Sequence, residues 1–182
     1  IGQAAFGEGT AAATAWLEAQ RHALAHAPSP AGVLAACRAV QELVAQEKVD
    51  ILTGFIYSPD AIASAALFTE AKRPAVIMNA GTAWITNLSP MISRVSFSMW
   101  HAGHAMGVAA AKNLKAKTAV VGYSDFPPGK DSLDAFKSGF ESSGGKVIDA
   151  IPMGGPGQVP DFTPFFQRAK GKKPNVFFFK MP

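Results

Sequence analysis

Cysteine and charged residues are scarce in this sequence of 182 residues, and long apolar runs are missing. The single cysteine, Cys37, cannot form an internal disulfide, which excludes a disulfide-stapled scaffold. No run of about 18 apolar residues is present, so the pattern predicts no membrane-spanning helix. The apolar share of 48%, with 16% charged residues, is typical of a globular domain that buries a core.

Basic residues outnumber acidic residues by 17 to 13, but they form no dense run. They stand at the ends of segments, as Lys170, Lys172 and Lys173 do near the end of a predicted helix, where they favour the helix dipole. Nucleic-acid-binding domains usually carry clustered Lys and Arg, so this scatter argues against a nucleic-acid partner. The sequence begins with Ile1 and has no signal segment, from which we expect a processed or truncated chain.

From Thr118 onward, β-rich and helical stretches alternate. The β-rich stretches are 118–123, 146–151 and 176–179. Helical patterns cover 132–143, where Gly144-Gly145 stops the helix, and a stretch that begins at Asp161 as N-cap. This order predicts a parallel sheet wound with helices. The last strand should be buried on both faces, yet no covering helix follows it, so we expect an incomplete chain.

The upstream half continues the same alternation. Val33, Cys37, Val40 and Val44 recur at helical spacing and predict a helix to about Glu47, with Cys37 on its apolar face. A strand over 49–56 then leads into Ser58-Pro59-Asp60, where serine suits the N-cap and proline the first helical position. That helix should run to about Lys72, before a strand over 75–79. Residues 1–27 receive no role in the sheet.

Two strand-to-helix junctions are candidate binding sites, because ligands of parallel sheets bind at the carboxyl ends of the strands. Tyr57-Ser58-Pro59 offers a hydroxyl and helix amides to an anion such as a carboxylate. Asn79-Ala80-Gly81-Thr82 offers small residues, free backbone groups and a second hydroxyl. An ordinary helix cap and a plain turn are the alternative interpretations.

Nucleotide, metal and catalytic motifs are not supported. The segment 124–130 resembles a phosphate-binding loop, but Gly122 and Gly129 are too far apart and Asp131 stands where that motif needs Ser or Thr. The pairs His22/His26 and His101/His104 lack further metal ligands at close spacing. No nucleophile elbow and no Ser/His/Asp arrangement is present. We therefore predict neither a cofactor nor an enzymatic activity.

Several segments, taken in order, closely resemble the type I periplasmic solute-binding proteins, and most of all the leucine/isoleucine/valine-binding family. They are Val49-Asp50-Ile51-Leu52-Thr53-Gly54, Ser58, Asn79-Ala80-Gly81-Thr82, Arg94-Val95-Ser96-Phe97-Ser98, Gly144-Gly145-Lys146-Val147 and Asp161-Phe162-Thr163. The resemblance implies an α/β fold with parallel, Rossmann-like sheets in two lobes, incomplete here. Residues 28–116 would belong to the first lobe and the crossover, and residues 117–182 would open the second lobe.

The resemblance also implies a ligand site. Ser58 and Ala80-Gly81-Thr82 would bind a ligand carboxylate, with Trp100 and Phe126 as aromatic cleft residues and Tyr57 as an additional one. A core or interface position remains the alternative for Trp100. Pro128 stands where amino-acid-binding relatives usually carry a tyrosine, so a larger or aromatic carboxylate suits the sequence as well as leucine does.

Members of this family deliver ligands to ABC importers. The resemblance therefore implies a periplasmic, or lipid-anchored extracytoplasmic, protein without catalysis that binds branched-chain amino acids or related apolar and aromatic carboxylates between its lobes. Its partners would be that small molecule and a membrane permease. Two alternatives stay open at this point: a ligand-binding sensor domain of the same fold, and a small-molecule enzyme on a doubly wound fold.

Overall fold

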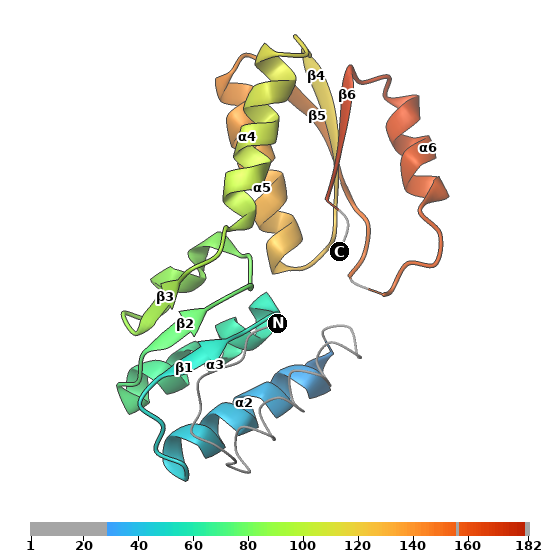
Figure 1. Cartoon of the computed structure of the whole chain (residues 1–182). Coiled ribbons are helices and arrows are strands. Elements are labelled where there is room, and N and C mark those ends of the chain that lie inside the picture. Colours follow the sequence, from blue (N-terminus) through green and yellow to red (C-terminus); the bar gives the residue numbers. More distant parts are fainter. Residues whose placement is uncertain (1–28, 156, 181–182) are drawn as a thin grey trace. The chain divides into compact units, whose positions relative to one another are not determined.

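The computed structural model describes residues 29–155 and 157–180, which form helices and parallel strands (Figure 1). The chain divides into two compact units, the first ending at Ser96 and the second beginning at Phe97. Each unit has its own three-stranded sheet. Within the described ranges, no helix has both the length and the apolar character needed to cross a bilayer.

The first unit has a parallel sheet in the order β1-β2-β3, so the predicted parallel winding is confirmed. Its elements are α2 (Pro30–Ala45), β1 (Leu52–Gly54), α3 (Ser58–Ala71), β2 (Ala75–Ile77), the 3-10 helix η1 (Ala83–Asn87) and β3 (Ile92–Arg94). Leu52 pairs with Ala75, which in turn pairs with Ile92.

An apolar core joins the two helices of this unit to its sheet. Phe55 and Phe68 are fully buried and meet edge to face, with ring centroids 5.4 Å apart. Val40 from α2 and Ile77 from β2 belong to the same cluster. Cys37 is half-buried, and its Sγ lies 3.8 Å from the Ser64 Oγ on α3, so the packing of α2 against α3 includes the cysteine as a small buried group.

The second unit has helices on both faces of a parallel sheet in the order β5-β4-β6 (Figure 1). Its elements are α4 (Met99–Lys112), β4 (Thr118–Tyr123), α5 (Pro127–Ser142), β5 (Lys146–Pro152), α6 (Thr163–Gly171) and β6 (Val176–Lys180). Val121 on β4 packs with Phe136 and Phe140 of α5. The adjacent Val120 points to the opposite face and packs with Ala169 of α6.

The predicted starts of α3 and α5 were wrong. Tyr57 is the N-cap of α3, so Ser58 is the first helical residue and its hydroxyl is left for a contact outside the helix. The helix predicted over 132–143 begins five residues earlier, at Pro127. Prolines are tolerated in a first helical turn because their fixed φ suits the helix and their missing N–H would be unpaired there anyway.

Strand ends and burial also differ from the prediction. The strand predicted over 49–56 is reduced to Leu52–Gly54, because Phe55 takes a left-handed φ of 62° that ends the extended backbone. The N-cap of α6 is Phe162, one residue after the predicted Asp161, whose carboxylate accepts a hydrogen bond from the Thr163 amide at 2.8 Å. Strand β6 is only half-buried, because among the described strands it pairs with β4 alone.

Helix α4 packs on α5, which places it with the second sheet. We expected residues 28–116 to belong to the first lobe and the crossover; the assignment of residues to lobes stays a prediction, whereas the compact units divide between Ser96 and Phe97. The two helices are close because glycines lie between them. A Cβ on Gly107 would lie 2.3 Å from the Phe136 carbonyl oxygen, and one on Gly139 2.2 Å from the His104 carbonyl oxygen.

Replacing Gly107 with alanine should therefore destabilise the fold although alanine is the better helix former. The added methyl group meets backbone atoms that cannot rotate away, so we expect a loss of about 1–3 kcal/mol in the free energy of unfolding. Gly32→Ala is the matched control, because the nearest atom to its Cβ, the Ser29 Oγ, is 3.5 Å away. Urea unfolding of Gly32→Ala should show equal or higher stability, and equal losses in both variants would contradict the close-approach argument.

Asp60 is a buried acid in the first turn of α3. Asp60 is 2% exposed, and its Oδ2 has no hydrogen-bond partner among the described residues. Loss of hydration disfavours the carboxylate and raises the pKa of Asp60 to about 6. The folded protein therefore holds this proton more tightly than the unfolded chain does, and stability falls as pH rises through that pKa.

The variant Asp60→Asn should remove this pH-dependent cost. A shift of about two pKa units corresponds to about 3 kcal/mol, so the variant should be more stable than the parent by up to that amount at about pH 7.5. The advantage should vanish below about pH 3, where Asp60 is protonated in both states. Urea midpoints across this range test it, with the exposed Asp134→Asn as control; a constant difference at every pH would refute the titration of Asp60.

Candidate functional site

The loops that follow β1 and β2 lie side by side at the carboxyl edge of the first sheet. Backbone hydrogen bonds join them: the Met78 amide donates to the Gly54 carbonyl and the Ala80 amide to the Phe55 carbonyl, both at 2.8 Å. The Asn79 side-chain amide adds a bond of 3.3 Å to the Ile56 carbonyl. The two predicted junctions, far apart in the sequence, thus form one structure, as expected for adjacent parallel strands.

Ser58 and Thr82 meet within this structure. The Thr82 amide donates a hydrogen bond of 3.1 Å to the Ser58 Oγ, and the two residues are 0% and 1% exposed respectively. Because the Ser58 hydroxyl accepts this bond, its own hydrogen can still be donated. The Thr82 Oγ1 is also buried and has no hydrogen-bond partner within the described ranges. An unpaired buried hydroxyl is costly, which favours a role in binding a polar ligand.

The backbone amides of Ala80 and Gly81 differ in whether they are free to bind a ligand. The Ala80 amide is already bonded to the Phe55 carbonyl, so it is not free to donate to a ligand, and a direct contact from Ala80 stays a prediction. Among the described residues, the buried Gly81 has no hydrogen bond from its amide. The Gly81 amide and the hydroxyls of Ser58 and Thr82 are three donors, a set suited to the two oxygens of a carboxylate.

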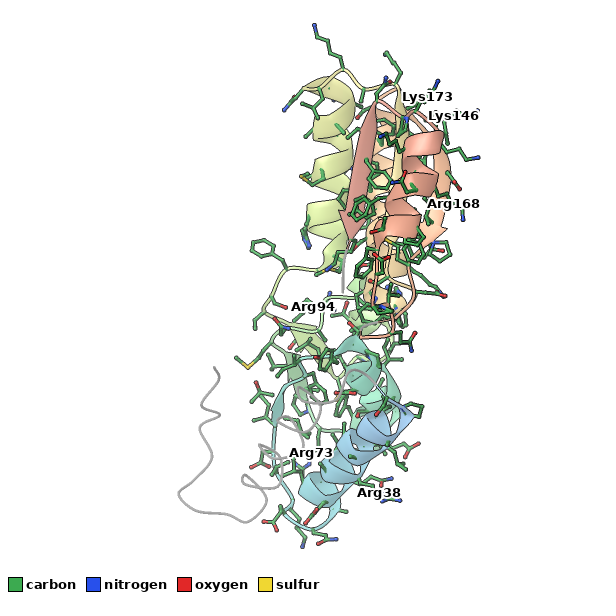
Figure 2. All side chains as sticks on the ribbon, turned by 90° about the vertical axis from the view of Figure 1, so that its right-hand side faces the viewer. Arg38, Arg73, Arg94, Lys146, Arg168 and Lys173 are labelled. Carbon is green, nitrogen blue, oxygen red and sulfur yellow. The ribbon has the colours of Figure 1, made fainter. Side chains whose placement is uncertain are left out.

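Arg94 is a site residue that the sequence patterns did not assign to the site. It ends β3, the neighbour of β2, and its guanidinium donates to the carbonyl oxygens of Thr82 and Ala83. These bonds hold the loop and bring a positive charge near its donors, which favours an anion. The sequence feature that could have identified Arg94 is its position, because it is the last residue of a strand whose end adjoins the loop. Figure 2 labels this side chain.

Trp100 and Phe126 belong to the second unit. Trp100 lies in the first turn of α4, is 41% exposed and stacks on His104 with an interplanar angle of 13°. Phe126 is half-buried at the N-cap of α5. Tyr57, the N-cap of α3, is half-buried in the first unit. The association of Trp100, Phe126 and Tyr57 with a ligand stays a prediction.

The histidines of α4 have local partners. The His101 Nδ1 accepts a bond of 3.1 Å from the Ser98 amide and so closes a capping box at the start of the helix. His104 is engaged in the stack with Trp100. The pair His22/His26 lies outside the described residues. In the part of the chain that the structure describes, no three His, Cys, Asp or Glu residues form a group able to hold a metal ion.

Comparison with known proteins agrees with this architecture. Residues 33–182 match the model of a family described as periplasmic binding protein. Leu/Ile/Val-binding protein homolog 6 of Brucella abortus is 39% identical over 143 residues, which are 78% of this chain and 36% of that protein.

Solved structures give the same result. A solute-binding protein of an ABC transporter from Rhodopseudomonas palustris, in complex with 4-hydroxybenzoate, aligns with a TM-score of 0.74 and 39% identity over 85% of this chain and 40% of that chain. A second one, from Rhodopseudomonas palustris BisB5 with 3,4-dihydroxybenzoic acid, has a TM-score of 0.73 and 34% identity over 94% and 50%. The leucine-binding protein of Thermotoga maritima shares the fold, with a TM-score of 0.68 and 24% identity over 94% and 52%.

The chain thus spans between about a third and a half of the length of these relatives. The matched family is described as periplasmic binding protein, and the similar structures from Rhodopseudomonas palustris are solute-binding proteins of ABC transporters. With a family match over most of its length, parallel α/β units and close relatives among ABC solute-binding proteins, this chain belongs to the periplasmic binding protein family, with the type I fold.

Proposed function

We propose that the protein is the substrate-binding component of an ABC importer and binds a small apolar or aromatic carboxylate. The observation that carries the proposal is the Ser58–Thr82 contact, in which the Thr82 amide bonds to the Ser58 hydroxyl although 24 residues separate the two. Both residues are buried, and each also has a hydroxyl hydrogen that can be donated to a ligand. With the Gly81 amide they offer three donors, and each hydrogen bond to a charged group contributes about 1.5–3 kcal/mol.

The class of ligand is inferred from the relatives and from the aromatic residues. Two of the similar structures were solved with hydroxylated benzoates, and the curated relative is named for leucine, isoleucine and valine. Phe126 and Trp100 supply flat apolar surfaces suited to an aromatic ring, and the buried Pro128 replaces the tyrosine expected of an amino-acid-binding member. We therefore place aromatic carboxylates beside branched-chain amino acids as candidate ligands.

Family membership supports the proposed import role and the proposed partner. We infer that the ligand-bound protein acts outside the cytoplasm, in the periplasm or attached to the membrane by a lipid, and docks on a membrane permease. The protein supplies no bond-making chemistry in this mechanism. Its residues bind the carboxylate through fixed hydroxyl and amide donors, and closure of the lobes would bury the apolar part of the ligand.

Removing both hydroxyls by Ser58→Ala with Thr82→Val should weaken carboxylate binding by at least about tenfold, because two donors to a charged group are lost. Isothermal titration calorimetry with benzoate, 4-hydroxybenzoate and leucine measures the effect. Ser64→Ala with Thr69→Val is the matched control, since it removes two hydroxyls from the same helix α3 away from the loops. Unchanged affinity in the first variant would refute the carboxylate site.

A thermal-shift panel should separate the candidate ligands. Branched-chain amino acids, aromatic amino acids, benzoates and the neutral benzamides are compared at equal concentration. A ligand at 100 times its dissociation constant stabilises the folded state by about 2.7 kcal/mol, which is readily measured. We expect carboxylates to stabilise the protein and the matching amides to do so far less. Equal stabilisation by benzoate and benzamide would contradict recognition of the anion.

A further inference from the structure

Lysines that are scattered in the sequence gather at one edge of the second unit. All three strands of its sheet are parallel, so their first residues lie at the same edge. Lys117 directly precedes β4, Lys146 is the first residue of β5, and Lys172 and Lys173 precede β6. Neighbouring strands are about 4.8 Å apart, which brings these starts within about 10 Å of one another.

Hydrogen bonds confirm that the strand starts adjoin. The Lys146 amide donates to the Lys117 carbonyl at 2.9 Å, and the Lys117 amide donates to the Asn175 Oδ1 at the same distance. Figure 2 shows Lys146 and Lys173 labelled at one end of this unit. The connections from α4 and α6 reach the same edge and add three more lysines. This basic edge comprises Lys112, Lys115, Lys117, Lys146, Lys170, Lys172 and Lys173, all exposed.

The charge of the basic edge is not neutralised locally. Ion pairs of the described residues involve Arg73, Lys130 and Arg168, and none involves a lysine of the edge. Asp149, the acid closest in sequence, is paired with Arg168, and the Glu141 carboxylate accepts a bond from the Val147 amide. The helix dipole accounts for Lys112 and Lys170 at helix ends, but not for Lys117 and Lys146, which stand at strand starts.

The positive charge of the chain is concentrated in this unit. Residues 97–182 contain eleven Lys and Arg against six acidic residues, whereas residues 1–96 contain six against seven. Asp125, Asp131 and Asp161 follow β4 and β5, toward the carboxyl edge of the sheet. Lys130, which pairs with Asp125, and Lys180 at the end of β6 lie toward the same carboxyl edge. The second unit therefore has a basic amino edge and a nearly neutral carboxyl edge, and its field would orient the amino edge toward an anionic surface.

An exposed apolar side chain stands among the lysines. Leu114 is 70% exposed and lies between Lys112 and Lys115 in the turn that connects α4 to β4. A leucine flanked by lysines suits the boundary between lipid headgroups and acyl chains, where the side chain enters the apolar region and the ammonium groups stay with the phosphates.

We propose that the basic edge binds the surface of a membrane that contains anionic phospholipids, with Leu114 entering the headgroup region. Lysines near such a surface act as separate point charges, each of which strengthens binding about fivefold. A nucleic acid is less suitable, because the edge has no aromatic side chain on which bases could stack and no arginine for bidentate contacts. The contact would leave the carboxyl edge of the sheet facing away from the lipid.

Sedimentation with vesicles tests the proposal. The probe is phosphatidylcholine vesicles with about one third phosphatidylglycerol at about 0.1 M salt, compared with pure phosphatidylcholine. We expect binding to the anionic vesicles only, and its loss at about 0.5 M salt. Lys115→Glu with Lys117→Glu and Lys173→Glu should raise the lipid concentration for half-binding at least about tenfold.

The matched control changes the same net charge in the first unit. Arg38→Glu with Lys48→Glu and Lys72→Glu alters three exposed cations, two of them in the left-handed conformation that Lys115 and Lys173 also adopt. It should bind vesicles like the parent protein. Equal weakening by both triple variants would mean that net charge alone attracts the chain to lipid, and would overturn the proposal.

Two single variants test the same proposal if a triple variant does not fold. Lys146→Glu alone should weaken vesicle binding about fivefold. Leu114→Ser should weaken vesicle binding at intermediate salt, because an apolar contact is lost. The dependence of vesicle binding on salt concentration should stay unchanged, because the lysines remain. No sedimentation of the parent protein with anionic vesicles would overturn the proposal, as would tighter binding of a DNA duplex than of the vesicles.

Discussion

The parallel direction of every strand is the constraint on which the rest of the structure depends. Because each strand runs the same way as its neighbour, the carboxyl ends of β1 and β2 meet at one edge of the first sheet. The start of α3, with Ser58, and the loop that carries Thr82 therefore adjoin, although 24 residues separate the two side chains. In the second sheet the same rule brings the strand starts together and with them the lysines of the basic edge.

The start of α3 connects helix formation to binding. A serine used as N-cap would bond to an amide of its own helix, whereas Ser58 is the first helical residue and accepts a bond from the Thr82 amide in the next loop. Helix and loop are thereby held together by a group that can still donate to a ligand. Arg94 adds a second constraint by donating hydrogen bonds to the carbonyl oxygens of Thr82 and Ala83.

Glycine determines which elements pack together in the second unit. Gly107 and Gly139 allow α4 and α5 to approach until a methyl group on either would meet backbone atoms. This close contact assigns α4 to the sheet that follows it in the chain. Periodicity and turn residues predicted α5 and the strands of this unit, but they did not predict that α4 packs on α5, because glycine spacing by itself does not name the partner helix.

The sequence by itself determined the α/β alternation, the parallel winding, the family resemblance and the two junctions that carry Ser58 and Thr82. These features depend on local periodicity, on turn residues and on an ordered set of motifs. Only the tertiary structure decided that the Ser58 hydroxyl bonds to Thr82, that Arg94 holds the loop and that scattered lysines form one edge. It also decided that the Asp60 Oδ2 is buried with no hydrogen-bond partner among the described residues. The physical reason is that each depends on strand pairing and burial between segments distant in sequence, which local patterns do not specify.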